Sequence, residues 1–163
     1  EAIGAGTMAA RNDELARRAV SAWAGVGGLE LLGNLEAPRL PIFSFRIRDA
    51  EGGYVHQQLV TRLLSDRYGI QARGGCACAG PYAMQLLAIE PEEQQWLREQ
   101  ILAGNEILKP GFTRLNFSVL LAESKVAYIL SSVAELAGEA GIHRKDYEVD
   151  AARAIFSPLS LVA

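Results

Sequence analysis

The sequence predicts an α+β domain, with a small antiparallel or mixed sheet of three to four strands and helices packed on one face of it. Two segments, at residues 40–48 and 112–120, alternate strictly between apolar and polar residues, as strands with one buried face do. The other regular segments repeat apolar residues at helical spacing and are longer than the strands. Few short strands among longer helices favour this fold class.

The N-terminal third predicts one helix and two strands. Apolar residues recur at helical spacing from Leu15 to Trp23, which indicates a helix over residues 13–24 that the following glycines end. The sequence LELLG at 29–33 is typical of a short strand. The strand at 40–48 carries Phe43, Phe45 and Ile47 on one face and Ser44, Arg46 and Arg48 on the other.

The middle of the chain predicts a helix, a strand and a second helix. Four apolar residues share one face of a helix over residues 54–68, and Gly69 is a suitable end for it. IQARG at 70–74 indicates a short strand. A short helix is expected over residues 81–89, directly after a glycine-rich stretch.

The C-terminal part begins with a helix over residues 90–103, since Pro91 and acidic residues favour a helix start. The strand at 112–120 follows, then a helix over residues 124–140 with an apolar stripe. We interpret residues 1–163 as a single domain, with a helix that leads into it in residues 1–25 and a strand plus tail in residues 147–163. The polar faces of the strands carry Arg46, Arg48, Arg114 and Asn116.

The composition restricts the possible functions. Half of the 163 residues are apolar and 21% are charged, which is ordinary for a globular domain. A net charge of -3 argues against a general binder of nucleic acid or of anionic membranes. Two cysteines do not make a disulfide framework, so we expect a reducing, cytoplasmic location. The N-terminus lacks the layout of a signal peptide, and no apolar run has the length of a membrane span.

Both cysteines lie in the sequence ARGGCACAG at residues 72–80. A structural zinc site needs four ligands, and His56 and His143 are isolated and distant, so no metal site is expected. A disulfide between Cys76 and Cys78 would close a small, strained ring. A reactive thiol is more plausible, because the glycines Gly74 and Gly75, the charge of Arg73 and the helix expected at Pro81 all favour a thiolate. The alternative is that small cysteines merely pack in this loop.

The sequence YGIQARGGCACAGP resembles the region around the sulfur-accepting cysteine of class V, fold-type I, pyridoxal-phosphate enzymes. The pattern is closest to group II cysteine desulfurases and selenocysteine lyases, where it reads Arg-x-Gly-x-x-Cys-Ala-x-Pro. It falls here on Arg73, Gly75, Cys78, Ala79 and Pro81. The later sequence GFTRLNFSVL resembles the family strand whose arginine binds the substrate carboxylate, and Arg114 matches that arginine.

The resemblance implies that this chain is the C-terminal small domain of a class V aminotransferase-like enzyme. In such an enzyme Cys78 would be catalytic, while Arg73 and Arg114 would bind an amino-acid substrate. Pyridoxal phosphate would be held by the large domain of the parent chain, which would be a homodimer. Lys109, Lys125 and Lys145 are the only lysines here, and none resembles the cofactor lysine. The domain would therefore bind no cofactor and be inactive alone.

Several functions stay open at this point. Desulfurases often carry histidines just before the cysteine, where this chain has Cys76 and Ala77, so desulfurase, aminotransferase and other lyase activities remain alternatives. A function of another class is a stand-alone thiol module that carries sulfur as a persulfide on Cys78. A third is a protein-interaction domain that uses the polar face of the sheet.

Overall fold

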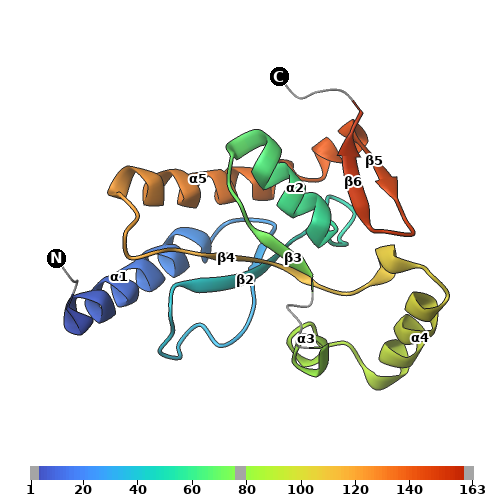
Figure 1. The fold of residues 1–163 in the computed structure, drawn as a ribbon, viewed down its shortest axis with the longest axis horizontal. Helices are drawn as coiled ribbons and strands as arrows, with labels where there is room; N and C mark the ends of the chain where they lie inside the picture. Colours follow the sequence, from blue (N-terminus) through green and yellow to red (C-terminus); the bar gives the residue numbers. More distant parts are fainter. Residues whose placement is uncertain (1–3, 76–79, 160–163) are drawn as a thin grey trace.

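The computed structural model describes residues 4–75 and 80–159, so Cys76, Ala77, Cys78 and Ala79 lie outside the described residues. Figure 1 shows the arrangement of its helices and strands. The helices are α1 (Ala5–Trp23), α2 (Gln57–Tyr68), α3 (Gly80–Leu86), α4 (Pro91–Leu102) and α5 (Glu123–Glu139), with short 3-10 helices η1 (Glu106–Leu108) and η2 (Ile142–Asp146). The strands are β1 (Leu29–Leu31), β2 (Ile42–Ile47), β3 (Arg73–Gly75), β4 (Phe112–Asn116), β5 (Tyr147–Asp150) and β6 (Ile155–Pro158).

The main sheet has four antiparallel strands in the order β1-β2-β4-β3. Its two central strands, β2 and β4, are the two segments whose sequences alternate most strictly. The chain between them forms α2, the edge strand β3 and then α3 and α4. The predicted α+β fold class is therefore confirmed, and a separate antiparallel hairpin of β5 and β6 is added to it.

One face of the main sheet forms the core together with α1, α2 and α5 (Figure 1). Trp23 at the end of α1 is fully buried, and its indole N–H donates to the carbonyl of Leu130 in α5 over 3.0 Å. Its ring meets that of Phe43 edge to face, with 5.3 Å between the centroids. The largest fully buried side chains come from both the sheet and the three helices: Leu15, Trp23, Phe43, Phe45, Ile47, Leu59, Val60, Leu63, Leu64, Val126, Val133 and Leu136.

The opposite face of the sheet carries the polar residues that the alternation predicts. Ser44 pairs with Arg114 and Ile42 with Asn116, so these side chains point away from the core. One end of this face is covered by α3, where Ala83 and Leu87 pack against Leu32 and Phe112. The rest of this face, which we call the open face, is not covered by any helix of the described residues.

Helix α4 lies mostly at the surface. Pro91 and two glutamates begin it as predicted, but Leu97 is its only buried residue. Trp96 is 49% exposed and Leu102 is 78% exposed, so the apolar stripe of this helix does not reach the core. None of the helices in the described part of the chain is both long enough and apolar enough to cross a bilayer.

Residues 147–158 form the β5–β6 hairpin, where the sequence predicted one strand and a tail. The hydroxyl of Tyr147 donates to the carboxylate of Asp66 in α2 over 3.0 Å. Burial and this hydrogen bond raise the pKa of Tyr147 to about 12. The ring of Phe156 lies against that of His56, with 5.3 Å between the centroids. The hairpin is thus fixed to both ends of α2.

The side chain of His56 caps the N-terminus of α2. Its Nδ1 accepts from the backbone N–H of Gln58 over 3.2 Å, while its Nε2 is buried without a hydrogen bond of good geometry among the described residues. Burial lowers the pKa of His56, and the backbone of Ile107 offsets part of that effect. A proton on Nδ1 would remove the cap and place a charge on a half-buried ring.

We predict that His56 makes the domain less stable in mild acid. The unfolded chain takes up a proton near the ordinary pKa of 6.5, whereas the folded chain does so only at lower pH. The free energy of unfolding should therefore fall as the pH drops below about 6.5. Urea unfolding between pH 8 and pH 4.5 measures this, with His56→Asn as a variant that keeps a cap but does not titrate. If His56→Asn and the parent lose stability in parallel, His56 is not the cause.

Candidate functional site

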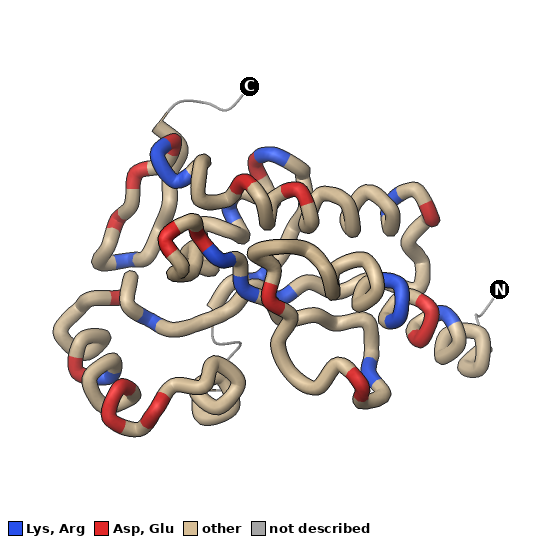
Figure 2. Tube along the Cα trace, turned by 180° about the vertical axis from the view of Figure 1, so that it is seen from behind, with Lys and Arg blue, Asp and Glu red and all other residues tan. Residues whose placement is uncertain are grey.

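The candidate site is a row of polar residues that crosses the open face. In the register of the sheet, Arg73 of β3 lies directly opposite Arg114 of β4, which in turn lies opposite Ser44 of β2. Sequence analysis predicted that both arginines bind substrate, and the structure brings the two side by side on neighbouring strands. In Figure 2 several basic segments lie near the middle of the domain, with acidic segments among them and further basic segments towards its edges.

Arg114 is the half-buried member of this pair. Within residues 4–75 and 80–159, no side chain or backbone atom forms a hydrogen bond or an ion pair with its guanidinium group. A guanidinium group presents five N–H donors in a planar fork, which suits a carboxylate. The residue can therefore hold an external carboxylate without first breaking a bond within the described chain.

Two further arginines on this face are held differently. Arg46 and Arg48 donate to the two carboxylate oxygens of Glu30 over 2.8 and 3.1 Å, and the hydroxyl of Tyr54 donates to Glu30 as well. Both guanidinium groups lie over the ring of Tyr54, at 3.8 and 4.7 Å from its centroid. Burial opposes ionisation of Glu30, but the hydrogen bonds and the two arginines lower its pKa below the ordinary value. These two arginines share one carboxylate as their partner, whereas Arg114 has no such partner among the described residues.

Two glycines, Gly74 in β3 and Gly111 just before β4, allow the close packing that places Arg73. A Cβ atom on Gly74 would lie 2.8 Å from the Thr61 hydroxyl and 3.1 Å from the Gln57 carbonyl, both in α2. A Cβ atom on Gly111 would lie 2.8 Å from the backbone of Gly75. The glycines that sequence analysis assigned to the cysteine loop, Gly74 and Gly75, thus belong to β3. At Gly74 helix α2 leaves room only for backbone, whereas at Gly75 the space is open and the positive φ of 118° favours glycine.

Gln57 links the elements around β3. Its backbone carbonyl accepts from the hydroxyls of Thr61, over 2.7 Å, and Thr113, over 3.4 Å. Its side-chain amide donates to the carbonyl of Lys109 over 3.3 Å. The first turn of α2 is therefore bonded to the strand that carries Arg114 and to the segment just before it. Sequence analysis did not single out Gln57, Glu30 or Tyr54, because only the pairing of distant segments brings them to the site.

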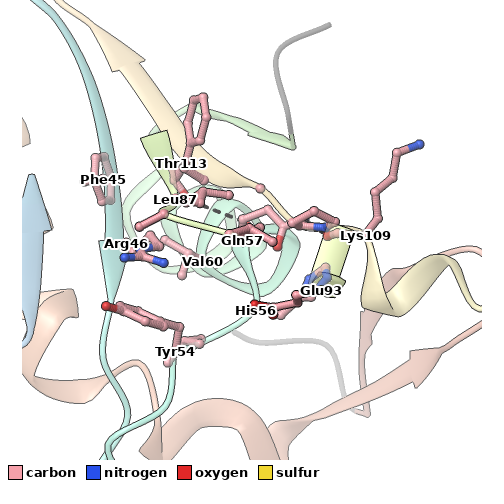
Figure 3. Close-up of a pocket in the computed structure, with 16 residues that line it drawn as sticks. Phe45, Arg46, Tyr54, His56, Gln57, Val60, Leu87, Glu93, Lys109 and Thr113 are labelled. Carbon is pink, nitrogen blue, oxygen red and sulfur yellow. Dashed lines mark hydrogen bonds between the residues drawn. The ribbon is translucent and has the colours of Figure 1, made fainter. Parts of the chain in front are cut away.

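A cavity of about 360 Å³ lies next to the row, at the end of β2 and β4 (Figure 3). Arg46 and Tyr54 face each other on one side of it, and His56 and Gln57 line another side. Lys109 also lines it, but its ammonium group pairs with Glu106 over 3.5 Å and points away from the cavity in Figure 3.

Pyridoxal phosphate does not fit the residues described here. The cofactor needs a lysine that reaches its ring from within a pocket. Lys125 and Lys145 are exposed on the surface, and Lys109 is exposed and paired. The described residues also contain no group of three or more histidine, cysteine or acidic side chains placed to hold a metal ion. Among the described residues, Arg114 has the geometry to bind and orient an anion.

Comparison with known proteins adds no further identification. No protein-family model matches the chain, and no curated protein matches it significantly. The predicted role of Arg114 and Arg73 therefore rests on the sequence motif and on the geometry of the row. Cys78, the predicted catalytic residue, lies outside the described residues, as does Cys76, and stays a prediction.

We predict that alanine at either tight glycine shifts β3 and destabilises the domain. Gly111→Ala and Gly74→Ala should each cost about 1–3 kcal/mol by overpacking, with the larger loss for Gly111, since its added atom meets rigid backbone. Urea unfolding measures the loss. Gly6→Ala in α1 is the matched control, because nothing lies within 4 Å of its Cβ position. Unchanged stability in both variants would contradict the close approach of β3.

Proposed function

We propose that this chain is the small domain of a pyridoxal-phosphate enzyme of the class V aminotransferase type, and that it closes over an amino-acid substrate. Its own contribution to binding is the carboxylate contact made by Arg114 together with Arg73. The observation that carries the proposal is the pairing of these two arginines across β3 and β4, with no partner for Arg114 among the described residues. This pairing brings together the motif that contains Arg73 and the motif that contains Arg114, which lie about forty residues apart in the sequence.

A carboxylate suits this row better than a neutral group. It can accept two parallel N–H bonds from the fork of Arg114, and charge-assisted bonds of this kind are stronger than neutral ones. A bond to a charged group contributes about 1.5–3 kcal/mol, so the isolated domain should bind a simple carboxylate only weakly.

The remaining parts of the catalytic apparatus belong to a second domain in this proposal. That domain supplies the lysine and the phosphate-binding groups, because the exposed lysines of this chain are unsuited to the task. The open face is the surface that would turn towards it. Cys78 follows Arg73 by five residues and is the predicted sulfur acceptor if the parent enzyme is a desulfurase. The domain alone is inactive.

We predict that Arg114 responds to a carboxylate ligand and not to its amide. In a ¹⁵N spectrum of the arginine side chains, L-alanine should shift the Nε–H signal of Arg114, whereas L-alaninamide should leave it unchanged. Arg114→Gln should abolish the response, and Arg98→Gln, an exposed arginine in α4, should preserve it. Equal shifts with both ligands would contradict the carboxylate assignment, and so would the absence of any shift at Arg114.

A second prediction concerns the cofactor. When the purified chain is mixed with pyridoxal phosphate and reduced with borohydride, labelling should be low and spread over the exposed lysines. Peptide mass mapping measures the distribution. Stoichiometric labelling of a single lysine would mean that this chain builds a cofactor pocket of its own, and the proposed division between two domains would be wrong.

A further inference from the structure

A larger cavity, of about 730 Å³, lies on another side of the domain. We call it the hairpin groove. The β5–β6 hairpin forms one wall, and α2, η1 and the end of α5 form the others. Its main apolar lining residues are Leu59, Ile107, Ala137, Tyr147, Val149 and Phe156. Neither Arg73 nor Arg114 lines it, although Tyr54, Val55 and His56 line both this groove and the cavity of Figure 3.

The charges around the groove cancel. Arg48 and Arg144 line it together with Asp49 and Glu51. Two of these four are already engaged, since Arg48 donates to Glu30 over 3.1 Å and Asp49 accepts from the backbone N–H groups of Glu51 and Gly53 over 3.0 and 2.8 Å. The electrostatic environment therefore favours neither a cation nor an anion.

The walls of the groove are fixed without a ligand. Tyr147 is bonded to Asp66, and Phe156 lies against His56. The backbone N–H of Ile107 donates to the carbonyl of Ala151 in the hairpin turn over 3.0 Å. Because these walls are already ordered, the protein loses little conformational freedom when a ligand binds, and this lowers the free-energy cost of binding.

Apolar side chains remain exposed at this groove. Val149 is 48% exposed although it shares a face of the hairpin with Tyr147 and Phe156, and Ile142 is 62% exposed. A bound molecule would cover them. Cavities of this volume, with mostly apolar and aromatic walls and a few polar groups, are typical of small-molecule sites.

We propose that the hairpin groove binds a small, uncharged, aromatic molecule. The aromatic walls supply ring contacts, since the side chains of Tyr147, Phe156 and His56 all line the groove. The balanced charges select against ionic analogues of the same molecule. This inference goes beyond the proposed function, because it depends on neither the arginine row nor a cofactor.

The test measures binding of indole to the parent protein and to a variant whose groove is filled by a larger side chain. Gly138 lines the groove within α5, and nothing lies within 4 Å of its Cβ position. Gly138→Leu should therefore fill the space, keep the helix and weaken indole binding at least tenfold in calorimetric titration. Gly6→Leu, at a helix glycine that is equally open and does not line the groove, should bind as the parent does.

A second pair of variants keeps the test valid if Gly138→Leu does not fold. Val149→Asp places a charge at the exposed wall of the groove and should also weaken binding at least tenfold. Ile155→Asp is its control, because Ile155 is similarly exposed, at 41%, but lies on the other face of the hairpin.

Charged analogues of indole test the proposed preference of the groove for uncharged ligands. Indole-3-acetate and tryptamine should each bind at least tenfold more weakly than indole. The proposal is overturned if indole shows no saturable binding, if both groove variants bind as well as their controls, or if either ion binds as tightly as indole. Amide shifts that map to the cavity of Figure 3, rather than to β5 and β6, would also overturn it.

Discussion

The close approach of three backbones at β3 is the constraint on which the candidate site depends. Helix α2, strand β3 and the start of β4 meet where Gly74 and Gly111 leave no space for a side chain. A short edge strand of three residues has few hydrogen bonds to hold it, so its position depends on this packing. Because the next residue back is Arg73, the two glycines also determine where that cation lies relative to Arg114.

The arginines of the open face differ in their contacts. Arg46 and Arg48 share Glu30 and the ring of Tyr54, so their charge contributes to the fold itself. Arg114 lies on the same face with no such partner among the described residues. This half-buried position is the reason why the proposed carboxylate contact is assigned to Arg114.

The sequence predicted structure best where the alternation of apolar and polar residues runs through a single strand. Phe43 and Phe45 alternate with Ser44 and Arg46, and that pattern predicted β2 and its buried face correctly. The pairing of Arg73 with Arg114 depends on the register between β3 and β4. The two sequence motifs suggested that these arginines lie close together, but the alternation of apolar and polar residues does not determine how strands pair. The hairpin was missed because its turn holds no glycine or proline: Asp150 forms it by accepting from two backbone N–H groups, and Ala154 adopts a positive φ of 52°.

Helix α2 lies between the candidate site and the hairpin groove, and adjacent residues of its N-terminus serve each. Gln57 is bonded to the threonines around β3 and β4, while the ring of His56 supports the hairpin. Energetic coupling between two sites requires an element with two arrangements that both sites bias. The first turn of α2 is held by separate contacts on its two sides, Gln57 to the threonines around β3 and β4 and His56 to Phe156 of the hairpin. We therefore expect ligands at the two sites to bind independently.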